Sequence, residues 1–416
     1  MKLAKLINES KAQFFIYGIG QAFNLVSPII VAPYIISVCS LASFGKVGLA
    51  FAFALFLILI VDYAFDIKGT KKVSENRNNL IVLQDILFTT VYTKIILVVI
   101  AFLLATILIF SIPLFANEKG LFFLSFVIVF AQVFNPIWFL QGLEDFKTSS
   151  WLNILSKLSY VFLVFCFVKI KSDYIYVNFF LGFSSLLFNL IGLIIIKKRY
   201  NFSFTQPKTR IIKKILVKDF FFCISQLFLS LRQLSPMFLS SYFFGFNLAG
   251  QYKIIEQIIS LFRTFNQVYL KYFFPRLCYK ITLSINDALI FWRKNLLILL
   301  IGVIIALLLI FLSSQEIISY FNIEIDENAE LIRIMKFSLI IPFLMVFSLS
   351  LEQLMLAFNK NRGYIKTTIS VTIINIVLLL ILTPILELYG VIFSLLIAEV
   401  FFIFLYYRNT ITSQKQ

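Results

Sequence analysis

Charged side chains stand inside several long apolar runs of this sequence, where they could bind an anion or carry a proton. Arg232 lies well inside the run 219–244, and Arg263 lies near the middle of the run 248–274. A charge at the centre of a membrane-spanning helix costs roughly 2.5–3.5 kcal/mol, so such residues normally face a cavity or an opposite charge. We therefore expect both arginines either to line an anion-binding cavity or to form buried ion pairs.

Two lysines could contribute to the same chemistry. Lys94 and Lys157 each lie within an apolar run, about 10–12 Å from its nearer end at a rise of 1.5 Å per residue. A lysine at that depth can extend its ammonium group to the membrane surface along its aliphatic stem. The sequence leaves both alternatives open for these residues, a cavity that binds anions or an extended side chain that reaches water.

Four carboxylates also lie within apolar runs, namely Asp62, Glu256, Glu352 and Glu399. Each could carry a proton or bind sodium in an ion-coupled transporter, and each could equally neutralise a nearby Lys or Arg. Glu256 follows Lys253 by three residues, a spacing at which the two side chains meet on one face of a helix. We expect Glu256 and Glu352, the deeper pair, to be the better candidates for ion coupling.

Enzyme chemistry is disfavoured by what the chain lacks. The sequence contains no histidine, and its four cysteines are scattered without a CxxC spacing, so histidine catalysis, a zinc site and a disulfide framework are not expected. Neither a phosphate loop nor a GxSxG or HExxH motif is present. The segment NPIWFLQGLEDFK (135–147) ends in paired carboxylates, but we interpret it as a solvated helix end that could gate substrate loading. We predict no enzyme, cofactor or metal.

The elements that must position these residues are membrane helices. The chain of 416 residues is 61% hydrophobic and 14% charged, far from the composition of soluble domains. A spanning helix needs about 20 apolar residues, and this requirement predicts an all-α integral membrane protein with twelve transmembrane helices. They are expected at 14–38, 46–66, 86–113, 121–141, 150–168, 175–196, 219–244, 248–274, 295–313, 331–358, 364–384 and 388–407.

Charge in the connections predicts the orientation of these helices. With the N-terminus inside, inside segments hold 26 Lys and Arg and outside connections hold 4, which places both termini in the cytoplasm. The net charge of +17 is therefore a topology signal with attraction for membrane lipid, and nucleic-acid binding is not expected.

The basic stretch KKRYNFSFTQPKTRIIKKILVKD follows the sixth predicted span. It divides the chain into a six-helix bundle at 1–200, a basic cytoplasmic linker at 201–218 and a second six-helix bundle at 219–416. Ser27-Pro28 followed by Tyr34 recurs as Ser235-Pro236 followed by Tyr242, as expected for parallel repeats.

Six motifs resemble those of a known transporter family. They are FNLVSPIIVAPYI, FGKVGLAFA, VDYAFDIKGTKKVSENRNN, NPIWFLQGLEDFK and AGQYKIIEQI with the later YFFPRLCYK. In order and spacing they are similar to the polysaccharide (O-antigen) flippases of the multidrug/oligosaccharidyl-lipid/polysaccharide exporter superfamily. The resemblance implies a MATE-like fold of two six-helix bundles in the bacterial inner membrane. It also implies transfer of undecaprenyl-diphosphate-linked O-antigen or capsule units to the periplasmic leaflet, and polymerase and chain-length proteins as partners.

The candidate residues agree chemically with such a substrate. A diphosphate suits a cationic cavity of Arg232, Arg263, Lys94 and Lys157, and sugars suit the amides and aromatic rings of Tyr17, Gln21, Asn24, Trp138, Gln226 and Gln233. Trp138 could instead pack within the bundle. The first span carries Asn24 where drug exporters of the superfamily commonly carry a carboxylate, so coupling to H⁺ or Na⁺ stays unassigned. A multidrug or metabolite exporter and a membrane glycan polymerase or ligase are the alternatives.

Overall fold

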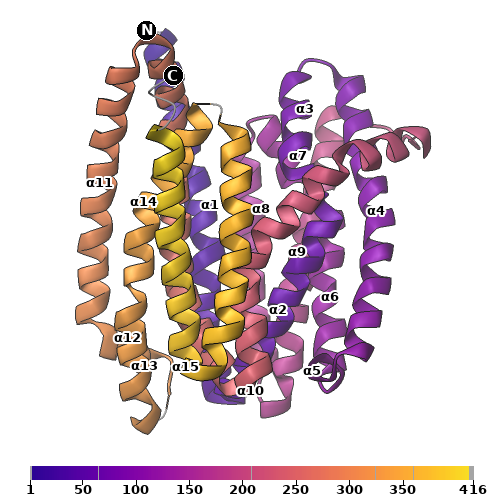
Figure 1. Ribbon diagram of the computed structural model, residues 1–416. Coiled ribbons are helices and arrows are strands. Elements are labelled where there is room, and N and C mark those ends of the chain that lie inside the picture. The colour runs from indigo at the N-terminus through magenta and orange to yellow at the C-terminus, as the bar shows by residue number, and fades with distance from the viewer. Residues whose placement is uncertain (1, 64, 208, 324, 359, 412–416) are drawn as a thin grey trace. The chain divides into compact units, whose positions relative to one another are not determined.

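The computed structural model describes residues 2–63, 65–207, 209–323, 325–358 and 360–411, although the side chains of 2–17, 19, 21, 22 and some later residues are not described. Within these ranges every regular element is a helix (Figure 1), which confirms the all-α class. In chain order they are α1 (Lys2–Cys39), α2 (Leu41–Asp62), η1 (Phe65–Gly69), α3 (Thr70–Glu75), α4 (Leu80–Ser111), α5 (Pro113–Ala116), α6 (Lys119–Val133), α7 (Ile137–Gly142), α8 (Phe146–Phe167), η2 (Lys171–Tyr176), α9 (Val177–Tyr200), α10 (Thr209–Leu283), α11 (Ile285–Leu312), α12 (Ser314–Tyr320), α13 (Ile325–Ser338), α14 (Ile340–Ala357) and α15 (Asn361–Ile411).

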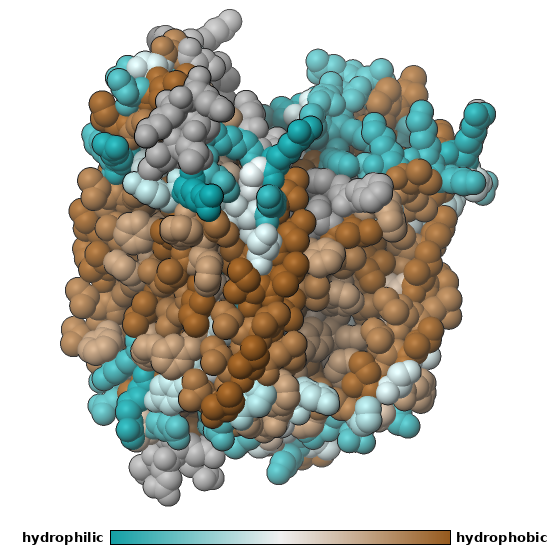
Figure 2. Space-filling view, viewed as in Figure 1, coloured by the Kyte–Doolittle hydropathy of each residue, from teal (hydrophilic) through white to brown (hydrophobic). Residues whose placement is uncertain are grey.

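Eight helical stretches among the described residues are long and apolar enough to cross a membrane. Figure 2 shows apolar side chains over the middle of the helices and polar ones gathered at their ends. This pattern fits a multi-pass membrane protein, because lipid tails offer no hydrogen bonds and helices satisfy their own backbone groups.

Two of the long helices bend sharply within their length. α15 bends at Glu387 (φ 50°, ψ −130°), and hydrogen bonds join its two arms, including one of 3.1 Å from Asn375 Nδ2 to the Ser394 carbonyl. Gly390 lets the arms meet, because a Cβ there would lie 2.2 Å from the Leu382 carbonyl oxygen. α10 likewise breaks at Gly245 (φ 76°). The total of twelve spans stays a prediction.

The chain folds as two compact units, 1–230 and 231–416, with the division inside α10. In the first unit α1 packs on α8 and α6 packs on α9, and in the second α14 packs on α15 and α11. The predicted boundaries, 1–200, 201–218 and 219–416, stay predictions.

Polar caps fix where several helices begin. The side chain of Asn79 accepts a hydrogen bond of 3.2 Å from the Val82 N–H at the start of α4. Asp145 does the same for α8 through the Thr148 N–H at 3.1 Å. Such caps satisfy backbone donors that a helix start leaves unpaired. Each cap therefore fixes the residue at which its helix begins.

The segment 135–147 is held to neighbouring connections at the same end of the first unit. Arg77 forms an ion pair of 2.8 Å with Glu144 and donates a 2.8 Å hydrogen bond from Nε to the Gly142 carbonyl. Arg199, at the end of α9, pairs with Asp145. The two carboxylates thus join three connections together, an arrangement that spacing along the sequence did not indicate.

A close helix contact gives a first prediction, for Gly182→Ala in α9. A Cβ at this buried position would lie 2.6 Å from the backbone nitrogen of Ile128 in α6. Because backbone cannot yield as a side chain can, we expect a loss of about 1–3 kcal/mol, seen as a lower melting temperature in detergent. Gly302→Ala in α11 is the matched control, since nothing lies within 4 Å of its Cβ. Equal melting of the two variants would contradict this packing.

The Asp145 cap predicts a pH-dependent stability. Burial raises the pKa of this carboxyl group, but hydrogen bonds from Thr148 and the ion pair with Arg199 outweigh it and hold the pKa below its ordinary value. A lowered folded pKa stabilises the protein above about pH 4, and this contribution is lost as the pH falls through the folded value. The melting temperature of the wild type should therefore approach that of Asp145→Asn as the pH falls below about 4. Parallel profiles at all pH values would contradict the assignment.

Candidate functional site

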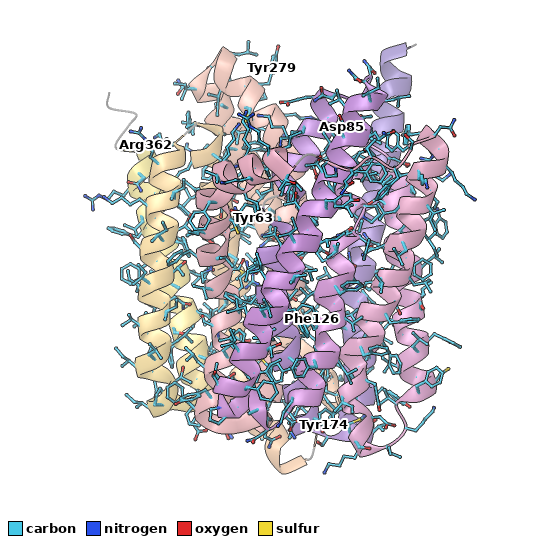
Figure 3. The ribbon with its side chains drawn as sticks, turned by 90° about the vertical axis from the view of Figure 1, so that its right-hand side faces the viewer. Tyr63, Asp85, Phe126, Tyr174, Tyr279 and Arg362 are labelled. Atoms are coloured by element: carbon cyan, nitrogen blue, oxygen red, sulfur yellow. The ribbon has the colours of Figure 1, made fainter. Side chains whose placement is uncertain are left out.

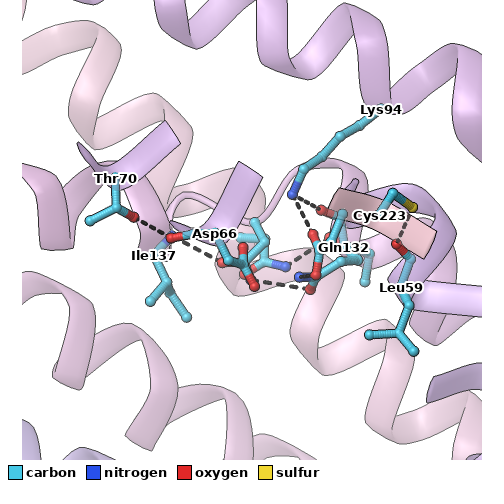
Figure 4. A network of polar contacts seen from close by, with 11 residues as sticks. Leu59, Asp66, Thr70, Lys94, Gln132, Ile137 and Cys223 are labelled. Carbon is cyan, nitrogen blue, oxygen red and sulfur yellow. Dashed lines mark hydrogen bonds and ion pairs between the residues drawn. The ribbon is translucent and has the colours of Figure 1, made fainter. Parts of the chain in front are cut away.

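The first unit contains a buried charge network around Lys94 (Figure 4). Lys94 is 0% exposed, and its ammonium group donates a 2.6 Å hydrogen bond to Asp62 Oδ1 and a 3.5 Å one to the Gln132 carbonyl. Gln132 Nε2 donates to the second oxygen of Asp62 at 2.7 Å. Both oxygens of the carboxylate are thus satisfied. Lys94 is a buried ion-pair partner, and its ammonium group does not reach the membrane surface.

A second carboxyl group extends this network. Asp66 in η1 forms a side-chain hydrogen bond with Asp62. A hydrogen bond between two carboxyl groups requires one of them to hold a proton, because ionised carboxylates only accept. The Asp62 carboxyl group therefore lies between the ammonium group of Lys94 and a second carboxyl group.

Trp138, another candidate of the first unit, lies in a hydrophobic core. Trp138 is 3% exposed and lies in a hydrophobic cluster with Val73, Leu83 and Phe139. Its ring packs against Gly69, where a Cβ would lie 2.9 Å from the indole. The sequence left two alternatives for Trp138, contact with sugars or packing within the bundle, and its surroundings are those of packing.

The polar positions of α1 and α8 complete the first unit. Lys157 is partly buried on α8, and among the described residues no ion pair or hydrogen bond involves its ammonium group. Asn24 is partly buried on α1 and has a polar or ring contact. The side chains of Tyr17 and Gln21 lie outside the described residues.

In the second unit Arg232 on α10 pairs with Glu399 on α15. The Nη2 of Arg232 lies 3.5 Å from Glu399 Oε1, and its guanidinium carbon lies 4.4 Å from the ring centroid of Phe402. Ser348 donates a 2.5 Å hydrogen bond to the other oxygen of Glu399. Because the guanidinium group of Arg232 stacks on the Phe402 ring, its N–H donors point outward in one plane. This geometry suits an anion that accepts two hydrogen bonds.

Glu352 stands beside this pair. Its carboxyl group hydrogen-bonds with Tyr364 and lies within electrostatic reach of Arg232 and Glu399. The Tyr406 hydroxyl, 3.1 Å from Thr368 Oγ1, belongs to the same polar group. The structure thus brings together three of the sequence candidates, although they lie on three different helices.

Lys253, Glu256 and Arg263 fall at helical spacing along α10, and this polar stripe supplies further charges. Lys253 and Glu256 form an ion pair of 2.6 Å, as their spacing predicts. Arg263 lies farther along α10, and its buried Nε has no hydrogen-bond partner within the described part of the chain. Arg263 is therefore a cation of this unit with a buried donor left for another group. Gln226 is partly buried and Gln233 exposed on the same helix.

Sequence reasoning missed one residue of this stripe. Asn266 is 0% exposed, and neither atom of its amide has a hydrogen-bond partner among the residues that the structure describes. An unsatisfied buried amide costs about 1–3 kcal/mol, so it points to a ligand or water. The signal was present in the sequence, because Asn266 follows Arg263 by three residues and so shares its face of the helix.

A family model described as "Polysaccharide biosynthesis protein" matches residues 10–278. The chain belongs to this family. Two curated relatives are each named "Putative O-antigen transporter": one from Escherichia coli (strain K12) is 24% identical over 92% of both chains. The other, from Shigella dysenteriae, is 24% identical over 44% of this chain and 45% of its own.

Solved structures share the fold of this family member. A multidrug resistance MATE family transporter of the MOP superfamily, in an inward-facing conformation, matches with a TM-score of 0.72 and 14% identity over 95% of this chain and 96% of its own. The lipid II flippase MurJ, in an inward closed conformation, matches with a TM-score of 0.71 and 15% identity over 97% and 87%. The MATE-like fold expected from the sequence is confirmed.

The Lys94 network predicts how paired substitutions behave. Lys94→Met leaves the Asp62 carboxylate without its cation, so we expect a loss of about 3–5 kcal/mol, measured as thermal unfolding in detergent. Adding Asp62→Asn removes the stranded charge and should restore most of that stability. Lys71→Met is the control, because the Lys71 side chain is 76% exposed. A double variant no more stable than Lys94→Met would contradict the pairing.

Proposed function

We propose that this chain is a flippase that moves a lipid-linked oligosaccharide between the leaflets of the bacterial inner membrane. The observation that carries the proposal is the match to an O-antigen transporter along 92% of both chains, together with the family assignment. We further propose undecaprenyl-diphosphate-linked O-antigen or capsule units as the substrate, moved from the cytoplasmic to the periplasmic leaflet.

The buried cations support this substrate chemically. A diphosphate that leaves water must replace its hydration with charge-assisted hydrogen bonds. Arg263 has a buried Nε without a partner among the described residues, and Arg232 is already oriented by Glu399 and Phe402. We propose these two as the principal substrate contacts, with Lys157 as a further cation. Lys94 would contact a substrate only by giving up its bonds to Asp62 and Gln132. The amides of Gln21, Asn24, Gln226 and Gln233 and the ring of Tyr17 stay candidates for the sugars, whereas Trp138 packs within the bundle.

We infer an architecture of twelve spans in two six-helix bundles with both termini in the cytoplasm. The breaks at Gly245 and Glu387 support it, because each would let one long helix cross the membrane twice. The excess of Lys and Arg in the inside connections gives the orientation. Alternating access would then expose the cations first to one face and then to the other, and polymerase and chain-length proteins would act on the product.

Ion coupling, where it operates, would use the paired carboxylates. Asp62 and Glu399 each accept hydrogen bonds from buried groups, and Glu256 pairs with Lys253. Protonation of any of them would release its cation, which links a proton to a change of contacts. Glu352, which hydrogen-bonds with Tyr364, is the fourth candidate, and the ion would be H⁺ or Na⁺.

The test of function is the position of the lipid-linked repeat unit. In cells that lack this chain, we expect the unit to accumulate in the cytoplasmic leaflet and surface glycan to be lost. Altered drug susceptibility with normal surface glycan would instead indicate an exporter. Units that are flipped but not joined would indicate a polymerase or ligase.

Arg263→Ala gives a sharper prediction. Charge-assisted hydrogen bonds contribute about 1.5–3 kcal/mol, so we expect surface glycan to fall about tenfold or more while membrane levels of the protein stay normal. Arg293→Ala is the matched control, because Arg293 is exposed on α11. Export that survives Arg263→Ala would contradict the role assigned to this cation.

Arg232 needs a paired variant, since removing it alone strands Glu399. Arg232→Met with Glu399→Gln keeps the charge balanced and should insert and melt like the wild type. We expect this double variant to lose export nonetheless, because the guanidinium that contacts the substrate is gone. Full export by the double variant would show that the pair is structural.

A further inference from the structure

The first unit contains a cavity away from its helix cores, at the end where α2, α4 and α10 meet. Its volume is ≈ 450 Å³, and its polar lining includes the lysines Lys68 and Lys72, the carboxylates Asp85 and Asp219, and the hydroxyls of Thr89 and Thr90. Figure 3 shows Asp85 at one end of the unit and Tyr174 at the opposite end. The charge count of the connections predicts that the Asp85 end faces the cytoplasm.

Polar contacts hold the walls of this cavity in place. Lys68 in η1 lies 2.5 Å from Asp219 in α10, and Asp219 is only 6% exposed. The hydroxyl of Tyr63 donates a 2.6 Å hydrogen bond to the carbonyl of Leu216. The beginning of α10 is thereby fastened to the end of α2, so the cavity is a built feature of the unit.

The charge around the cavity favours an anion. The two segments that form most of its wall, 66–85 and 197–219, carry twelve Lys and Arg and four Asp and Glu. Lys68 is balanced by Asp219, whereas the neighbouring Lys72 is exposed at the cavity. Such an excess of positive charge attracts phosphate groups, and Thr89 and Thr90 add hydroxyl donors in the wall.

Apolar side chains at the same end favour a lipid over a soluble anion. Ile211 lines the cavity and is 46% exposed, while Ile81 on α4 and Val217 on α10 are 76% and 68% exposed. Large apolar side chains mixed with lysines are typical of segments that lie at the level of lipid headgroups. The beginning of α10, TRIIKKILVK, has this composition.

We propose that this cavity binds the phosphate headgroup of a membrane lipid, with Lys72 as its principal contact and Ile86 and Ile211 along the lipid chain. The bound lipid would seal the gap between α4 and the beginning of α10. Two sources supply this chemistry, namely bulk phospholipid and a polyprenyl phosphate carrier. Binding is independent of glycan transport, so this proposal and the flippase proposal can fail separately.

Native mass spectrometry of the full chain in detergent tests the proposal. The probes are dioleoylphosphatidylglycerol, undecaprenyl phosphate and, as the phosphate-free lipid, dioleoylglycerol. We expect both phosphate lipids to bind at least fivefold more tightly than dioleoylglycerol, and Lys72→Gln to remove most of that difference. The matched control is Lys71→Gln, since Lys71 neighbours Lys72, is 76% exposed and does not line the cavity. It should change affinity less than twofold.

The same titration distinguishes the two possible lipids, bulk phospholipid and the polyprenyl phosphate carrier. Equal affinity for the two phosphate lipids would assign the cavity to bulk phospholipid, and a tenfold preference for undecaprenyl phosphate would assign it to the carrier. Val82→Trp, which fills the cavity from α4, should weaken both. The proposal is overturned when Lys72→Gln and Lys71→Gln bind alike, or when dioleoylglycerol binds as tightly as the phosphate lipids.

Discussion

A charged side chain loses several kcal/mol of hydration when it enters an apolar interior, and this cost organises both units of the chain. In the first unit the fully buried Lys94 is possible only because Asp62 lies against it and Gln132 satisfies what remains. In the second, Arg232 depends on Glu399 in the same way. The helices that carry these residues are therefore held together by charges that none of them could bury alone.

This constraint also separates structural cations from available ones. Lys94 has its donors directed at protein oxygens, and a substrate would have to displace them. Arg263 keeps a buried Nε without a partner in the described part of the protein, close to the unsatisfied amide of Asn266 on the same helix. A site that must take up and release an anion needs donors of this second kind, because fully paired groups gain nothing from a ligand.

The sequence singled out the charged candidates but gave few of their partners. Depth within an apolar run was enough to single out Arg232, Arg263 and Lys94, since the cost of burying a charge depends on position along a helix. Only the Lys253–Glu256 pair was predicted with its partner, because both residues lie on one helix. The pairs that join different helices depend on which helices are neighbours, and hydropathy does not encode that.

By itself the sequence determined the membrane class, the all-helical class and the family, because these follow from composition, from the length of apolar runs and from short motifs in order. Tertiary structure alone decided that Trp138 packs against Gly69 and that Arg77 forms an ion pair with Glu144. It also decided that Lys68 and Lys72 line a cavity. The physical reason is the distance along the chain over which each interaction acts. Hydropathy and helix caps act within a few residues, whereas ion pairs and packing depend on distances set only when helices far apart in sequence meet.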